Sequence, residues 1–297
     1  MYSAVRKNKL KTVLIIFAFV LLMSALGWVI SVTLDTPGFF IPMLIFAITY
    51  AGISYFASAK MAIAMTGAKP VTAQEAPRLY KIVENLSISA GMPMPKIYIV
   101  NDPAPNAFAT GRDPEHGVVA ATTGILDILD DSELEGVMAH ELSHVQNYDI
   151  RVTSIVIALV TIIAFVSDWL LRIGMFGGLG DRDSRAGGVM LLVSIVAAII
   201  APLIAMMLQL AVSRKREFLA DASGALMTRY PEGLASALQK IESSARPMRK
   251  ANNATAHLFL ANPFGREKRG QFVRKLFSTH PPTADRVAQL NQMGTEL

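Results

Sequence analysis

Four long stretches of the chain are almost free of charge, and they limit the folds open to it more than any other feature. They cover residues 12–34, 39–59, 152–171 and 189–212. Each is close to the roughly 20 apolar residues that an α-helix needs to cross a bilayer. We therefore expect about four transmembrane helices, arranged as two hairpins that span residues 1–60 and 152–213.

Two of these runs also have other interpretations. The first follows a basic segment, residues 1–11, and this combination is found in signal peptides as well. Its length and the lack of a small-residue cleavage site before Asp35 favour an uncleaved span. Asp168 interrupts the third run near its end, so the third and fourth runs could instead be buried helices that pack on a soluble domain.

Basic residues gather at the ends of the apolar runs, and their positions predict the orientation of the chain. The net charge is +5. Lys and Arg at the cytoplasmic flanks of membrane spans explain this charge better than binding to nucleic acid does. The positive-inside rule places residues 1–11 in the cytoplasm, and each hairpin then returns the chain to that side. We expect a multi-pass protein of the cytoplasmic (inner) cell membrane, with the bilayer as a partner and both termini in the cytoplasm.

Two segments have the composition of soluble protein, and we expect them to form the two halves of one domain. They cover residues 61–151 and 214–297. Helical periodicity over residues 74–90 and short strands over residues 96–100, 106–111 and 117–121 are predicted for the first half. A further helix is predicted to begin at Ser132, with Glu135 as its capping-box partner. The expected fold class is α+β and mostly helical.

This further helix carries His140, Glu141 and His144 in the pattern H-E-x-x-H. Residues four apart lie on one face of a helix, so both imidazoles can point a nitrogen at the same ion. Glu141 is rotated by about 100° from His140 and can take a proton from a water that zinc activates. The chain has no cysteine, so a metal must be held by His and carboxylates. The pattern predicts one catalytic Zn²⁺ per chain, with a pair of surface histidines as the alternative.

A catalytic zinc needs a third protein ligand, for which Glu217 is the candidate. Asp221 lies one helical turn further on and could accept a hydrogen bond from the second nitrogen of a ligand histidine. Alternatively, both acids belong to a solvated helix face that follows the basic residues 214–216. The second hairpin returns the chain to the side that it left, so Glu217 can approach His144, and this favours the ligand.

Four motifs carry a resemblance to a known family. They are H-E-L-S-H at residues 140–144, E-F-L-A-D at 217–221, N-A-F-A-T-G at 106–111 and H-P-P at 280–282. Over nearly its whole length, the chain resembles the HtpX-like bacterial membrane zinc peptidases, a family that also contains the type I CAAX prenyl proteases. The resemblance implies a gluzincin-type peptidase domain on four membrane helices, with Glu217 as the third zinc ligand. The chain is too short for the enclosed chamber of the prenyl proteases, so a prenylated substrate is not expected.

The resemblance also implies a substrate-binding edge strand at residues 106–111. Such a strand binds an extended peptide through main-chain hydrogen bonds. Asn106 and Ala107 are the expected substrate contacts, with Asn106 adding a side-chain bond to the substrate backbone. The alternative is an ordinary core strand that ends at Gly111.

The remaining histidines have weaker assignments. His280 could donate a hydrogen bond to the oxyanion of the reaction, or it could fasten the C-terminal helix to the domain together with Arg286. His116 and His257 have no partner at ligand spacing, and we expect both on the surface.

We therefore expect a membrane-integrated zinc metalloendopeptidase with its site at the cytoplasmic rim of the bilayer. By resemblance, its substrates would be misfolded or damaged membrane proteins, cleaved in quality control and the stress response. The alternatives are a narrow-specificity processing peptidase and a catalytically silent scaffold with a structural metal. Glu141 argues against the scaffold, because a structural zinc site needs no base beside its ligands.

Overall fold

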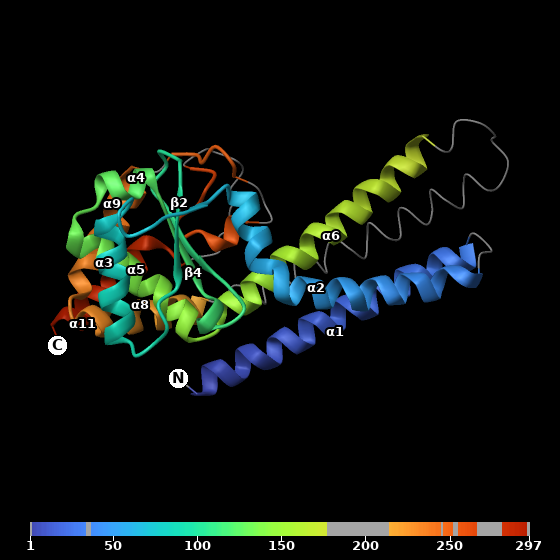
Figure 1. Cartoon of the computed structure of the whole chain (residues 1–297), viewed down its shortest axis with the longest axis horizontal. Coiled ribbons are helices and arrows are strands. Elements are labelled where there is room, and N and C mark those ends of the chain that lie inside the picture. The colour runs from blue at the N-terminus through green and yellow to red at the C-terminus, as the bar shows by residue number, and fades with distance from the viewer. Residues whose placement is uncertain are drawn as a thin grey trace.

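The computed structural model describes residues 2–33, 37–176, 214–244, 246–251, 255–265 and 281–295. In this part of the chain, long helices project from an α+β domain, and the start of the first helix lies beside that domain (Figure 1). The expected fold class, α+β and mostly helical, is confirmed. The fourth apolar run, residues 189–212, lies outside the described residues.

Three of the described helices are long and apolar enough to cross a membrane. They are α1 (Tyr2–Thr33), α2 (Phe40–Thr66) and α6 (Asp149–Phe176), of which the apolar spans are Val5–Val32, Phe40–Thr66 and Asp149–Val166. Large apolar side chains such as Phe17, Trp28 and Phe56 are exposed on α1 and α2. A surface of this kind suits a lipid environment.

The third apolar run packs mainly against the other membrane helices. Buried side chains of α6, including Ile155 and Leu159, form one cluster with Ile15 and Phe19 of α1. The hydroxyl of Tyr50 in α2 donates to the carbonyl of Ala158, with 2.9 Å between the two oxygens. This run is therefore a member of the membrane bundle, as Figure 1 shows, and does not lie flat on the soluble domain.

Two helix boundaries differ from those expected for the membrane hairpins. Helix α2 continues past Lys60 to Thr66, because Ala62 and Thr66 are buried against the domain. Gly67, in the left-handed conformation with φ at +71°, then ends it. Helix α6 begins at Asp149, before the apolar run itself.

The domain contains a four-stranded sheet with the order β1-β2-β4-β3. The strands are β1 (Lys69–Pro70), β2 (Lys96–Val100), β3 (Ala107–Thr110) and β4 (Val118–Thr122). Strands β2 and β4 are parallel, with Lys96 opposite Val118, while β1 and β3 run antiparallel to their neighbours. The expected short strands are thus present, and β3 lies at an edge of the sheet.

Helices cover the sheet and enclose the main core. They are α3 (Pro77–Ser89), α4 (Thr123–Ile128), α5 (Asp131–Gln146), α8 (Arg214–Thr228), α9 (Pro231–Ser243) and α11 (Thr283–Gly294). Short 3₁₀ turns lie at Pro37–Phe39 (η1), Pro114–His116 (η2) and Ala256–Leu258 (η3). Helix α5 is buried almost throughout, as a helix surrounded by other elements must be. It is the central element of the domain.

The N-terminus of α5 is capped two residues earlier than expected. The side chain of Asp130 accepts from the backbone N–H of Glu133, and the Glu133 carboxylate accepts from the backbone N–H of Asp130. This reciprocal pair is the capping box, in place of Ser132 and Glu135. Both candidate pairs have residue types that suit a capping box, and the helix begins at Asp131 with Asp130 as its N-cap residue.

Candidate metal centre

Helix α5 brings His140 and His144 together, one turn apart on the same face. Their Nε2 atoms are 3.2 Å apart, and the ring planes are nearly perpendicular at 89°. The His140 side chain is 1% exposed and that of His144 is 15% exposed. The two nitrogens therefore face a common point that solvent reaches from the His144 side.

Helix α8 adds Glu217 to this pair. Its carboxylate oxygens lie 3.7 Å from Nε2 of His140 and 3.6 Å from Nε2 of His144. Gly224 allows this approach, because a Cβ at its position would stand 3.0 Å from the backbone nitrogen of His140. The fully buried Ala220 also keeps this face of α8 narrow. Small residues thus bring the two helices into backbone contact beneath the site.

The three side chains fit a zinc ion by spacing and by chemistry. Their nearest ligand atoms are 3.2, 3.6 and 3.7 Å apart. Ligands with bonds of about 2.0–2.1 Å to a tetrahedral ion stand roughly 3.4 Å from one another. Two imidazoles and one carboxylate form a donor set typical of catalytic zinc, with one position left for substrate or water. Within the described ranges, His140, His144 and Glu217 are the one group of this kind.

Asp221 lies behind His140, as the sequence predicts for a carboxylate partner. Its Oδ1 is 2.9 Å from Nδ1 of His140. Arg286 of α11 binds the same carboxylate through two nitrogens, at 2.8 and 2.6 Å. Burial alone would raise the pKa of Asp221, but hydrogen bonds from Arg286 and His140 lower this pKa to about 2. The carboxylate is therefore charged and fixed in place, and Arg286 joins α11 to α8.

Asp149 stands in the equivalent position behind His144, with 3.1 Å between its Oδ2 and Nδ1 of the imidazole. Burial alone would lower the pKa of His144. The hydrogen bond to Asp149 and the charge of Glu217 outweigh burial and raise this pKa to about 9. A metal ion must therefore displace a proton from this imidazole when it binds at neutral pH.

Glu141 shares a pocket with the three candidate ligands. It is 3% exposed, and the pocket is also lined by Ala109 of β3 and by His257. His257 is 6% exposed, so the expectation of a surface position for it is wrong. Its segment folds back over the edge of the sheet, a contact that spacing in the sequence does not reveal. His116, in contrast, is exposed and pairs with Asp113.

The edge strand β3 offers one residue to the pocket. The backbone carbonyl of Asn106 accepts from the N–H of Thr122, so alternate residues of β3 direct their N–H and C=O groups away from β4. Ala107 and Ala109 are these residues. Of the two, Ala109 lines the pocket.

The chain itself occupies the groups of Asn106 and Ala107 that were expected to contact substrate. The Asn106 carboxamide donates to the carbonyl of Ala261 at 2.8 Å and accepts from its N–H at 3.0 Å. The Ala107 carbonyl accepts from the N–H of Leu260 at 3.0 Å. Asn106 is 2% exposed. In this structure neither residue is open to a substrate, since residues 260–261 pair with the start of the strand.

His280 lies outside the described residues, so its expected role stays a prediction. Asp149 was missed by sequence reasoning, although a carboxylate five residues after His144, at the start of an apolar run, was a weak signal. Asn8, which donates to Asp149 at 2.7 Å, carried no signal because 141 residues separate the pair.

Comparison with known proteins agrees with this geometry. The family model described as peptidase family M48 matches residues 73–294. A protease HtpX homolog of Tropheryma whipplei (strain Twist) is 50% identical over 296 residues, which cover 100% of this chain and 99% of that protein. A protease HtpX homolog of Dictyoglomus thermophilum is 43% identical, with 99% of this chain and 95% of that protein covered.

A solved structure has a similar fold. The crystal structure of S. mikatae Ste24p aligns with a TM-score of 0.52 and 16% sequence identity. The alignment covers 98% of this chain and 67% of that chain. At this identity the similarity concerns the fold alone.

Proposed function

The chain belongs to peptidase family M48 and is a membrane metalloprotease, and from this premise we propose a more specific function. It is a zinc-dependent endopeptidase that cleaves misfolded or damaged membrane proteins at the cytoplasmic face of the cell membrane. The observation that carries the proposal is the convergence of His140, His144 and Glu217 beside Glu141 in one pocket. This arrangement is what metal-assisted hydrolysis of a peptide bond requires.

His140, His144 and Glu217 would hold one zinc ion. The bound ion would supply a Lewis acid that polarises the scissile carbonyl and the attacking water. Asp221 and Asp149 fix the two imidazoles through their Nδ1 atoms, which leaves each Nε2 directed at the ion. Both partners are carboxylates, so they also increase the basicity of the ligands.

Glu141 is proposed as the general base. It follows His140 directly and therefore points in a different direction from the ligand side chains. From the pocket, its carboxylate would take a proton from the attacking water and later give it to the leaving amine. Glu141 is 3% exposed. Little bulk water therefore reaches its carboxylate to compete for this proton.

Ala109 is proposed as the main-chain contact for substrate. Its N–H and C=O face away from β4, and it lines the pocket of the metal ligands. An extended peptide could add to this edge as a further strand. The proposal moves the expected contact from Asn106 and Ala107 to the other end of β3.

The junction of α5 and α6 supports a site at the membrane rim. Only residues 147–148 separate the metal-ligand helix α5 from the membrane helix α6. The basic start of α1 lies beside the same domain in Figure 1, and the positive-inside rule places it in the cytoplasm. We also propose that residues 61–151 and 214–297 are two halves of one catalytic domain, interrupted by the second hairpin.

The test of the chemistry uses full-length protein in detergent with Glu141→Gln. The variant should retain one zinc per chain and lose casein cleavage by about 10²–10⁴-fold, the usual contribution of a general base. Glu135→Gln, on the same helix but away from the pocket, is the matched control and should cleave like the parent. If Glu141→Gln also cleaves like the parent, this assignment is wrong.

The test of orientation and substrate class uses cells. Since the chain has no cysteine, a single Ser243→Cys at an exposed position reports the side of α9. A membrane-impermeant maleimide should label it only after the membrane is opened. Cells with the parent should accumulate fragments of membrane proteins that are absent with Glu141→Gln, and a single recurrent fragment would favour a processing peptidase instead.

A further inference from the structure

Asn8 is a buried amide near the start of the membrane helix α1. It is 3% exposed, although its neighbours Lys7 and Lys9 are exposed. Burial of an amide costs free energy unless hydrogen bonds replace those to water. The Asn8 side chain donates to Oδ1 of Asp149 at 2.7 Å and to the carbonyl of Asn147 at 2.9 Å. Both acceptors lie directly after the helix that carries the metal ligands.

These bonds hold the carboxylate that contacts His144. Oδ1 of Asp149 accepts from Asn8 at 2.7 Å and from Arg216 at 3.2 Å. Oδ2, the other oxygen, is 3.1 Å from Nδ1 of His144. With Oδ1 held from two sides, the carboxylate presents Oδ2 to the imidazole. The Nδ1–H of His144 then donates to Asp149, so Nε2 is the nitrogen that is directed at the other ligands.

The two ligand histidines are supported in parallel ways. Behind His140, Asp221 is fixed by Arg286 from within the soluble domain. Behind His144, the corresponding carboxylate is fixed in part from the membrane bundle, by Asn8. One imidazole of the site therefore depends on a helix outside the domain.

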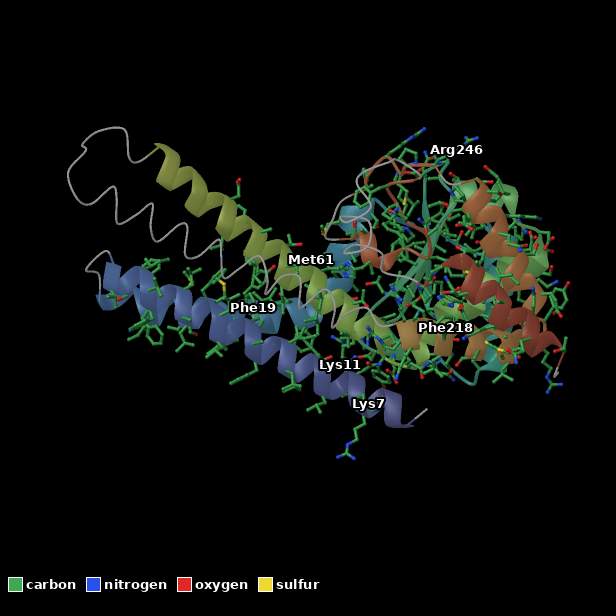
Figure 2. The ribbon with its side chains drawn as sticks, turned by 180° about the vertical axis from the view of Figure 1, so that it is seen from behind. Lys7, Lys11, Phe19, Met61, Phe218 and Arg246 are labelled. Atoms are coloured by element: carbon green, nitrogen blue, oxygen red, sulfur yellow. The ribbon has the colours of Figure 1, made fainter. Side chains whose placement is uncertain are left out.

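The packing of α1 keeps Asn8 in this position. Asn8, Thr12, Ile15 and Phe19 follow one another at helical spacing and are all buried. Ile15 and Phe19 pack in one cluster with residues of α6 such as Ile155. Figure 2 labels Lys7, Lys11 and Phe19 along this helix, from the end beside the domain into the bundle. The apolar seam thus sets the register of α1 against α6, the helix that begins at Asp149.

We propose that Asn8 is a positioning residue of the metal centre. It holds Asp149 in the orientation that aligns His144, and it makes the N-terminal membrane helix a structural part of the site as well as an anchor. The proposal rests on the zinc site proposed above and adds a dependence of that site on α1. Removal of the amide should weaken zinc binding even when the protein stays folded.

The experiment measures zinc affinity of the full-length protein in detergent by competition with a chromophoric chelator. Asn8→Ala should weaken zinc binding by about tenfold, the lower end of the range for residues that orient a ligand. Asn8→Gln keeps the carboxamide and should recover part of this loss. Thr12→Val is the matched control: among the described residues, the Thr12 hydroxyl donates to the backbone carbonyl of Asn8 and makes no bond to the Asn8 side chain or to Asp149. It should bind zinc like the parent.

A second readout separates positioning from general destabilisation. With cobalt(II) in place of zinc, the visible spectrum reports ligand geometry, and it should change in Asn8→Ala but not in Thr12→Val. Circular dichroism of the metal-free proteins establishes that each variant is folded. Parental affinity and an unchanged spectrum in Asn8→Ala would overturn the proposal, and so would an equal loss in Thr12→Val. Failure of the parent to bind zinc would instead overturn the metal site itself.

Discussion

Gly224 should control zinc binding, because it sets the distance between the two ligand helices. In Gly224→Ala, the new Cβ would stand 3.0 Å from the backbone nitrogen of His140 and 3.2 Å from the carbonyl carbon of Ala139. Both neighbours are backbone atoms of α5, which cannot rotate away. Helix α8 must therefore move outward, and it carries Glu217 and Asp221 with it.

The size of the effect follows from that contact. Contacts at 3.0–3.3 Å are closer than a Cβ normally makes, so relief of the clash requires a shift of a few tenths of an ångström. A metal site tolerates deviations of about 0.2 Å in its ligand distances. We expect zinc affinity to fall by about tenfold or more. The overpacking should cost about 1–3 kcal/mol of unfolding free energy, of which the better helix propensity of Ala recovers up to about 1 kcal/mol.

The assay combines zinc competition with thermal unfolding of the metal-free protein, and two matched variants interpret it. Gly52→Ala on α2 meets nothing within 4 Å, so it should leave zinc affinity unchanged and should not lower stability. In Gly136→Ala the Cβ would stand 2.6 Å from the backbone nitrogen of Leu234, so this variant separates α5 from α9. It should lower stability but largely retain zinc affinity. If Gly224→Ala is destabilised yet binds zinc like the parent, the geometric reasoning is wrong.

Three further predictions concern the surroundings of the site. Arg286→Ala should reduce zinc affinity by about tenfold, because it releases Asp221. Arg286→Lys should recover only part of the lost affinity, because an ammonium cannot make the paired contact with the carboxylate. Equal zinc affinity in the parent and both variants would contradict this prediction. Burial alone would raise the pKa of Glu133, but hydrogen bonds from Lys240, among others, outweigh it and hold this pKa below its usual 4.5. The stability that Glu133 contributes is therefore present above pH 4.5 and is lost as the pH falls through the lower pKa of the folded state. The unfolding free energy of Glu133→Gln should consequently fall less steeply with acid than that of the parent. Denaturant titrations between about pH 3 and 5 would show this difference. Ala109→Pro removes an N–H that faces away from β4 and should lower kcat/KM by about tenfold with zinc content unchanged; unchanged kinetics would exclude this edge as the substrate site.

The sequence was sufficient for the features that depend on spacing within one element. His140 and His144 lie one helical turn apart, so their convergence follows from helix geometry alone. The apolar runs also predicted the three described membrane helices, because the length and composition of a single run suffice for that assignment. The strand Lys96–Val100 was also predicted with its observed bounds.

The contacts that the sequence did not reveal are those between distant segments. Asn8 and Asp149 are 141 residues apart, and no local pattern links an amide in a basic flank to a carboxylate at a helix start. The edge of β3 was predicted as open, but residues 260–261 close its first half through bonds to Asn106. His257 is buried for a related reason, since its segment crosses the same edge. Such long-range pairings depend on how the elements pack.

The most direct test of the metal site is zinc K-edge X-ray absorption on full-length protein and on Glu217→Ala. We predict one zinc per chain in the parent, bound by two imidazole nitrogens and by oxygen at about 2.0–2.1 Å. In Glu217→Ala, the zinc should be bound at least tenfold more weakly, with the two imidazoles as its remaining protein ligands. A parent spectrum without two imidazoles, or a variant with unchanged affinity and spectrum, would contradict the assignment of His140, His144 and Glu217 as the zinc ligands.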